Sequence, residues 1–420
     1  MTVRITPLDN GLTVVTHHMP HVETVALGVW AGAGSRDETA EENGLAHLLE
    51  HMAFKGTPTR TAFDIAAEIE AAGGDMNATT SMEKTAYYAR VLKDDWRMAL
   101  DVMADIVMRP LFQPDDLELE KGVILQEIAA AQDTPDDLVF DQVQSAAWPD
   151  HPLGRDILGT PQTVRSFRED DLRRYRERHY TAERMVVSAA GHVDHEALVV
   201  ATARNLEGLR AGVAAERTMP AFRGGTIMTR RPLDQVHQVL AFPTIGYHHD
   251  DIYAAHLMAS ILGGGMSSRL FQEVREKRGL CYSTFAYVSA YADTGLVQVY
   301  AATAPDKAAE FVAVSADIVQ SLSASVGTDE LERARAQLKA SLVMSLESPS
   351  ARADQIARQF LTYGRVPPIA DILSRVDAVT TADISRLAGQ TFTGPAIAHA
   401  AVGATRSLAR SGDIAARFAR

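Results

Sequence analysis

One order of predicted strands and helices occurs twice along this chain, and this repeat most narrows the folds that the chain can adopt. In each half, strand-like segments lead to an amphipathic helix, then to further strands, then to a series of helices. The second copy follows the first after roughly 200 residues. A chain of 420 residues is also too long for one hydrophobic core. We therefore predict an α+β protein of two similar domains from an internal duplication, each a mostly antiparallel sheet packed with helices.

Residues 210–232 separate the two copies. They carry Gly, Pro and Arg and show no period typical of a helix or a strand. We predict a first domain over residues 1–209, a linker over 210–232 and a second domain over 233–420. The other predicted segments that matter below are helices over 134–147, 166–179, 268–277 and 351–361, and a loop over 152–163.

Composition excludes several classes of protein. The chain has 46% hydrophobic and 23% charged residues, as globular proteins do. Its formal net charge of −13 argues against a nucleic-acid-binding protein and fits basic peptide partners, although many globular proteins are acidic. A single cysteine excludes an internal disulfide. No apolar run could span a membrane, and the N-terminal segment reads as a hairpin, so we expect a cytoplasmic protein.

The stretch G-L-A-H-L-L-E-H-M-A-F-K-G, residues 44–56, has the pattern of an amphipathic helix. Four apolar residues recur at i, i+3, i+4 and i+7 and form one face: Leu45, Leu48, Leu49 and Met52. We predict Asn43 as the residue that caps this helix and Gly56 as its stop.

The same stretch places His47, Glu50 and His51 together as H-x-x-E-H. In a helix these three positions share one face. Two neutral imidazoles one turn apart suit a zinc ion, and the carboxylate beside them can hold the proton of a zinc-bound water. The alternative is a helix with a solvated polar side, because so short a motif also arises by chance. A zinc site needs a third ligand.

The sequence E-K-G-V-I-L-Q-E-I, residues 120–128, offers this ligand. Glu120 and Glu127 are seven residues apart, and therefore share one helical face. Apolar residues between them predict a mostly buried helix, in which Glu127 is costly unless it is paired or bound to a metal. Two solvated acids are the alternative.

H-x-x-E-H, followed by a glutamate 76 positions after the second histidine, resembles the inverted-zincin peptidases of the pitrilysin/insulinase family, M16. The chain is most similar to the small mitochondrial and bacterial processing peptidases, of the beta-subunit type. Further matching segments are N-A-T-T-S-M-E-K-T-A-Y-Y (77–88), H-P-L-G-R-D-I-L-G-T (151–160), A-A-G-H-V-D (189–194) and M-S-S-R-L-F-Q-E-V-R-E-K-R-G-L-C-Y-S (266–283). The resemblance implies a LuxS/MPP-like metallohydrolase fold.

The resemblance also implies roles for the residues of the first domain. His47, His51 and Glu127 would bind one Zn²⁺ per chain, and Glu50 would be the general base. Glu120 would orient a ligand histidine. The segment Asn77-Ala78 would lie in an edge strand along which an extended peptide substrate pairs.

Residues farther along the chain match the family too. Tyr282 would donate to the developing oxyanion and Arg275 would hold the peptide backbone. Without the resemblance they read as a helix-surface arginine and a strand tyrosine. Asp137 and Asp141 fall where the processing peptidases bind an arginine of the substrate, but Asp137 is also placed to serve as the N3 acid of a helix.

The implied function is a zinc-dependent endopeptidase that cleaves unfolded or presequence-like peptides, as a homodimer. Two alternatives remain: a catalytically silent structural subunit, like the core proteins of respiratory complexes, and a peptide-binding subunit that needs a partner. The histidines outside the motif have no identifiable third partner, and we interpret them as surface or structural residues: His17, His18, His192, His195, His248 and His249.

Overall fold

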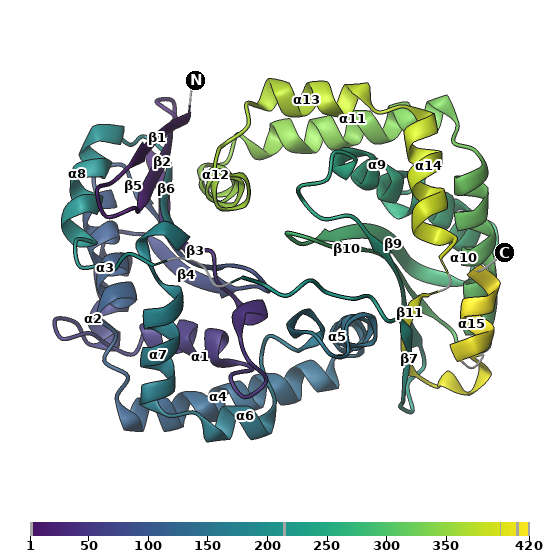
Figure 1. Cartoon of the computed structure of the whole chain (residues 1–420), viewed down its shortest axis with the longest axis horizontal. Coiled ribbons are helices and arrows are strands. Elements are labelled where there is room, and N and C mark those ends of the chain that lie inside the picture. The colour runs from purple at the N-terminus through teal and green to yellow at the C-terminus, as the bar shows by residue number, and fades with distance from the viewer. Residues whose placement is uncertain (1–2, 213–215, 395, 409–410, 419–420) are drawn as a thin grey trace. The chain divides into compact units, whose positions relative to one another are not determined.

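The computed structural model describes residues 3–212, 216–394, 396–408 and 411–418. The chain divides into two compact units, each with helices and one sheet (Figure 1). The first unit comprises the chain up to Ala129, Asp156–Thr218 and Val343–Pro367. The second comprises Ala130–Arg155, Met219–Leu342 and the chain from Pro368 onward.

The strands of the first sheet are β1 (Val3–Pro7), β2 (Thr13–His18), β3 (Thr24–Ala31), β4 (Asp75–Thr80), β5 (Thr85–Leu92) and β6 (Met185–Gly191). The helices with them are α1 (Leu45–Ala53), α2 (Ala62–Ala71), α3 (Trp96–Met108), α4 (Pro114–Asp133, which crosses into the second unit's segment), α6 (Pro161–Ser166), α7 (Glu169–His179), α8 (His195–Asn205) and α12 (Pro349–Tyr363). The N-terminal hairpin is confirmed, because β1 and β2 pair antiparallel.

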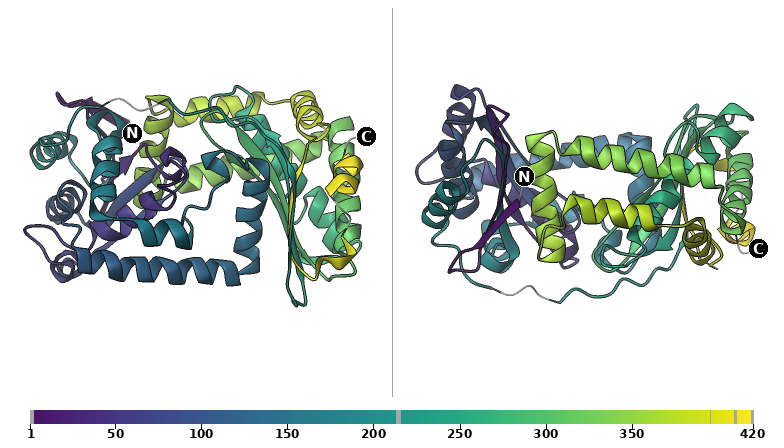
Figure 2. Two further views of the ribbon diagram at one scale, coloured as in Figure 1. Left: turned by 60° about the horizontal axis from the view of Figure 1, so that its bottom comes forward. Right: turned by 90° about the horizontal axis from the view of Figure 1, so that it is seen from above.

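The strands of the second sheet are β7 (Gly225–Arg230), β8 (Val236–Thr244), β9 (Cys281–Ala290), β10 (Gly295–Thr303) and β11 (Ala398–Gly403). The helices are α5 (Pro135–Ala147), α9 (Ile252–Gly263), α10 (Ala308–Ala324), α11 (Thr328–Ser345), α13 (Ile369–Ala378), α14 (Thr381–Phe392) and α15 (Ser411–Phe418). Figure 2 shows α10 and α14 on one side of this sheet.

The second sheet has the topology of the first without its edge strand β1. The first has the order β1-β2-β6-β3-β5-β4, and the second has the order β7-β11-β8-β10-β9. Strands β7 to β11 correspond, in chain order, to strands β2 to β6. The one parallel pair of the second sheet, β7 with β11, therefore corresponds to the one parallel pair of the first, β2 with β6. All other neighbouring pairs are antiparallel. The prediction of two similar α+β domains is confirmed.

Alternation along β3 explains how the first sheet is covered on both faces. Val25, Leu27 and Val29 belong to the core that α1 and α3 complete, whereas Ala26 and Trp30 pack with α12. A strand that is buried on both faces has no polar side, and this one reads as a nearly continuous apolar run. The α1 face that points into the core is the one predicted from its four apolar residues.

Two helices pack in the unit that their place in the sequence does not suggest. α5 precedes β6 along the chain but packs on β8 and β11 of the second sheet. α12 lies late in the chain but packs on β3 and β6 of the first sheet. Both helices were predicted from the sequence, but a helical pattern does not say which sheet a helix covers. The domain boundaries at residues 209 and 233 therefore remain a prediction.

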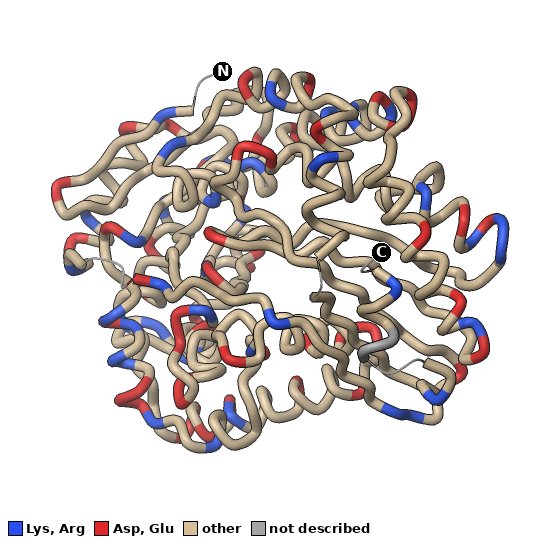
Figure 3. Tube along the Cα trace, turned by 45° about the vertical axis from the view of Figure 1, so that its right-hand side comes forward, with Lys and Arg blue, Asp and Glu red and all other residues tan. Residues whose placement is uncertain are grey.

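Some elements differ from the prediction. β7 lies inside the predicted linker, whose residues 213–215 fall outside the described part of the chain. α6 begins inside the predicted loop. Acidic and basic residues are interspersed along the trace (Figure 3). Among the described residues, no single helix is both long and apolar enough to cross a membrane; α10 and α11 pass that test only jointly, as a pair bent by 99°.

Candidate metal centre

Helix α1 is fixed at its first turn by a buried carboxylate. Glu38 accepts the backbone N–H groups of Gly44 and Ala46, at 3.0 and 2.7 Å. The predicted cap at Asn43 is wrong, because the helix begins after Gly44, at φ +98°, and the Asn43 amide donates to the Asp156 carbonyl. Glu38 thus performs the capping role from outside the helix, and burial raises the pKa of its carboxyl group to about 8.

The polar face of α1 presents His47 and His51 side by side. Their ring centroids are 4.6 Å apart, at an interplanar angle of 67°. Burial lowers the pKa of His47 to about 4, with a further contribution from His51. His47 is therefore neutral at physiological pH, which is the form that binds a metal.

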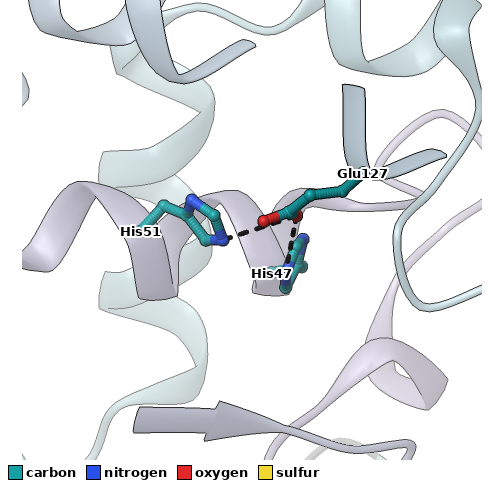
Figure 4. A group of neighbouring side chains, drawn as sticks. All are labelled: His47, His51 and Glu127. Atoms are coloured by element: carbon teal, nitrogen blue, oxygen red, sulfur yellow. Dashed lines mark ion pairs between the residues drawn. The ribbon is translucent and has the colours of Figure 1, made fainter. Parts of the chain in front are cut away.

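Glu127 reaches this pair from α4 (Figure 4). Its Oε2 atom lies 3.8 Å from His47 Nε2 and 3.7 Å from His51 Nε2. One ligand atom from each of these three residues lies within 4.8 Å of the others, and in the described part of the chain no other group of three or more such residues does so. The structure brings together the ligand set that the sequence suggested.

These distances fit a shared metal better than direct hydrogen bonds. Glu127 Oε2 is buried and has no hydrogen-bond partner among the described residues, and 3.7 Å is too long for a hydrogen bond. Two ligand atoms that each lie about 2.0–2.2 Å from one ion are separated by roughly this distance. Two imidazoles and a carboxylate are also a donor set that zinc takes in catalytic sites. The residues therefore fit Zn²⁺.

A second acid and a lysine hold His51 in place. Glu120 Oε2 accepts a hydrogen bond from His51 Nδ1 at 2.9 Å, and Lys55 Nζ lies 2.5 Å from Glu120 Oε1. Burial by itself would raise the pKa of Glu120, but the hydrogen bonds from Lys55 and His51 outweigh it and lower that pKa. Because the carboxylate accepts from Nδ1, the lone pair of His51 is at Nε2, which faces Glu127.

Glu50 lies on the same helix face and is held by the edge strand. Thr80 Oγ1 on β4 donates to Glu50 Oε2 at 2.5 Å. Burial raises the pKa of Glu50, against the hydrogen bond from Thr80. A partly buried carboxyl group with a raised pKa is typical of general bases that act near neutral pH.

Family models match both halves of the chain. The model described as "Insulinase (Peptidase family M16)" matches residues 13–161, and the model described as "Peptidase M16 inactive domain" matches residues 166–338. A relative from Rickettsia bellii, named an uncharacterized zinc protease, is 40% identical over 93% of this chain and 95% of its own length. A relative of the same name from Mycobacterium tuberculosis is 40% identical over 92% of this chain and 90% of its own.

The chain belongs to the insulinase family of peptidases, M16. Solved structures show the same fold at low identity. A peptidase M16 inactive domain from Pseudomonas fluorescens superposes with a TM-score of 0.90 at 21% identity, over 97% of this chain and all of that one. A chain of complex III from Candida albicans gives 0.88 at 24% identity, over 99% of this chain and all of that one. The fold alone therefore does not decide between peptidase and structural subunit.

The segment predicted to bind substrate lies in an edge strand of this M16 chain. β4 ends the first sheet, and it carries Asn77, which is exposed, and Ala78, which is 8% exposed. The Asn77 side chain accepts the N–H of Ala78 at 2.8 Å. An edge strand presents backbone groups to which an extended peptide can pair.

Arg275 and Tyr282 are brought together in the second unit. The predicted helix over 268–277 is π-helical over Phe271–Glu276, a form that often occurs at functional sites. The Arg275 guanidinium lies 4.6 Å from the centroid of the Phe271 ring and 4.7 Å from that of the Tyr282 ring. Tyr282 is 78% exposed at the start of the edge strand β9, so its hydroxyl is accessible.

The two acids of α5 also lie in the second unit. Asp137 and Asp141 are one turn apart and exposed. Thr134 precedes the helix and Pro135 is at its first position, as predicted, but Thr134 makes no side-chain capping bond. The roles of these two acids, and of Arg275 and Tyr282, remain predictions.

Sequence reasoning missed three residues that position the metal centre. Lys55 is four residues after His51 and eight after His47, so the helical period already placed it on the polar face. Thr80 is two residues from Ala78 and shares its face of β4. Glu38 lies in an irregular segment, where no periodic signal could have indicated its contact with α1.

Proposed function

We propose that this chain is a zinc-dependent endopeptidase that hydrolyses extended peptides. The observation that carries the proposal is the buried Oε2 of Glu127, which has no hydrogen-bond partner among the described residues and lies 3.7–3.8 Å from two imidazole nitrogens. Glu50 lies on the same helix as those imidazoles, where hydrolysis needs a base. The names of the relatives support the same activity.

His47, His51 and Glu127 would hold the ion. Zn²⁺ bound there would polarise the scissile carbonyl and lower the pKa of a water molecule. Glu50 takes the proton of the attacking water at its carboxylate and later passes a proton to the leaving amine. Glu120, held by Lys55, keeps the Nδ1 proton of His51 in place throughout. No covalent intermediate with the protein is needed.

The substrate proposal rests on edge strand β4. An unfolded or presequence-like peptide would pair with its backbone near Asn77 and Ala78. The side chain of Asn77 would then release the Ala78 N–H that it now accepts. We further propose that Tyr282 donates to the developing oxyanion, that Arg275 holds the peptide backbone, and that Asp137 and Asp141 receive a basic side chain.

A catalytically silent subunit is the second candidate, because a chain of complex III shares the fold. The ligand set, Glu50 and the Arg275–Tyr282 pair are all present here, which favours the peptidase. We also propose a homodimer, which light scattering on the purified chain would test.

The test is digestion of an unfolded, arginine-containing peptide by the purified chain alone, with zinc measured in the same samples. The wild type is expected to cleave the peptide and to hold one zinc per chain. Glu50→Gln is expected to keep the zinc ion of this centre and lose turnover, and His51→Ala to lose both, because His51 is a ligand of that ion and Glu50 is not. An active Glu50→Gln variant would contradict the mechanism, and a zinc-free wild type would favour the silent subunit.

A further inference from the structure

Two histidines outside the candidate zinc site meet at one end of the first sheet. β2 ends at His18, and β6, its parallel neighbour, ends at Gly191. The register pairs His18 with Gly191, so His192 follows directly beside it. The two imidazole rings lie edge to face, with their centroids 5.6 Å apart. Because the two histidines are 174 positions apart, the sequence alone did not indicate that they are neighbours.

A backbone carbonyl fixes the tautomer of each ring. His18 Nδ1 lies 2.9 Å from the Val193 oxygen, and His192 Nδ1 lies 3.3 Å from the Val22 oxygen. A carbonyl oxygen can only accept, so Nδ1 carries the proton and the lone pair of each neutral ring is at Nε2. Neither Nε2 atom has a hydrogen-bond or ion-pair partner in the part of the chain that the structure describes. Metal-binding histidines are oriented by outer hydrogen bonds of this kind.

Both rings line a surface cavity of about 490 Å³ whose other polar groups are mostly engaged. Both nitrogens of His195 bond to threonine hydroxyls, at 2.8 and 2.7 Å. Arg4 also lines the cavity, and its positive charge is offset by an ion pair with Glu196. Asp194 also lines the cavity, and one of its oxygens accepts the Ala197 N–H. The free imidazole nitrogens of His18 and His192 are thus the donors best placed for a metal.

We propose that His18 and His192 bind a late first-row divalent metal ion, such as Zn²⁺, through their Nε2 atoms, with water completing the coordination. Imidazole nitrogen suits these ions. An ion held about 2.0–2.1 Å from each nitrogen can join two rings at this separation. The candidate zinc ligands His47 and His51 have a comparable centroid distance of 4.6 Å. Such an ion would tie the end of β2 to the connection after β6.

The test uses full-length His51→Ala protein, because this substitution removes a ligand of the other metal centre. The result therefore does not depend on the proposed function. Zn²⁺ is titrated calorimetrically at neutral pH into this protein and into the same protein with His18→Gln or His192→Gln added. His249→Gln is the matched control, because it removes a histidine of the second unit. Thermal unfolding with and without Zn²⁺ is measured in parallel.

His51→Ala protein, which is expected to be purified without zinc, should bind one added Zn²⁺ per chain at His18 and His192, and should melt at a higher temperature when Zn²⁺ is added. Loss of a hydrogen-bond partner of a metal ligand lowers metal affinity by roughly 10- to 100-fold, and loss of a ligand should lower it at least as much. His18→Gln and His192→Gln should therefore each weaken zinc binding by at least this factor and abolish the thermal shift. His249→Gln should change neither. Unchanged zinc binding in folded His192→Gln protein overturns the proposal, even if His18→Gln fails to fold, because His192 lies after the strand. Absence of zinc binding by His51→Ala protein overturns it as well.

Discussion

At the scale of single residues, the metal centre depends on a series of contacts between side chains, of which only the last would bind the metal. Lys55 neutralises Glu120, Glu120 holds the Nδ1 proton of His51, and His51 then presents Nε2 toward Glu127. Each contact determines the orientation or the charge of the next group. Removal of the positive charge of Lys55 should therefore weaken metal binding, although Lys55 does not contact the metal.

Lys55→Met is expected to weaken zinc binding by about 10- to 100-fold, as removal of outer-shell partners does. The buried Glu120 carboxylate would lose its cation and hold the His51 proton less firmly. Competition with a calibrated chelator measures the affinity. Lys93→Met serves as the control, because Lys93 pairs with the exposed Glu23 elsewhere in the same unit. Equal affinities of Lys55→Met and wild type would refute this dependence.

Thr80→Val should lower kcat by about 10- to 100-fold, because a hydrogen bond to a charged group is worth about 1.5–3 kcal/mol. The substitution conserves the shape of the side chain but removes the donor that orients Glu50. Zinc content should stay at the wild-type level, and Thr80→Ser should restore most of the rate. Steady-state kinetics on one peptide would show the effect in kcat rather than KM. A loss of zinc in Thr80→Val would instead indicate a structural role.

At the scale of elements, α1 is positioned by a group that its own sequence does not contain. Glu38 satisfies two N–H groups at its start, and the four apolar residues of the helix fix its opposite face in the core. Helix period and apolar face could be predicted, because both are local properties of the sequence. The cap could not, because a carboxylate from an irregular segment reaches the helix only in the folded chain.

Glu38→Ala should reduce the free energy of unfolding by about 2–4 kcal/mol, because two buried N–H groups would lose their acceptor. Urea denaturation of the metal-free protein, followed by circular dichroism, measures the change. Glu41→Ala is the matched control on the same segment, since Glu41 is exposed. A shift in the urea midpoint no larger than that of the control would show that Glu38 does not stabilise α1.

At the scale of the whole molecule, the duplication was visible in the order of elements, whereas the packing partners of two helices were not. Strand segments are local features of the sequence, so most of them, although not β7 and β11, could be read from periodicity. α5 and α12 are amphipathic wherever they pack, so only the three-dimensional structure shows that α5 covers the second sheet and α12 the first. β7 was missed because its residues are half-buried without alternation.

His399, a buried histidine of the second unit, makes the stability of the protein depend on pH. Burial lowers the pKa of His399 to about 4, from 6.5 when exposed, and neither ring nitrogen has a hydrogen-bond partner among the described residues. Between these values the unfolded chain binds the extra proton, so the stabilisation is complete above pH 6.5 and is lost as the pH falls toward 4. For His399 this difference amounts to about 3 kcal/mol over this window.

His399→Leu should therefore flatten the decline of stability between pH 6.5 and 4. Urea midpoints measured across this range for variant and wild type give the two slopes. The slope is the readout because the substitution also changes packing, which shifts stability equally at every pH. Identical slopes would mean that His399 is protonated without cost in the folded protein.

The claim on which this account rests is that two imidazoles of α1 and one carboxylate of α4 share a single zinc ion. Anomalous diffraction at the zinc edge, on crystals of the protein as purified, tests it most directly. The account predicts a peak about 2.0–2.2 Å from His47 Nε2, His51 Nε2 and Glu127 Oε2. A map with no anomalous peak between these three side chains would contradict it.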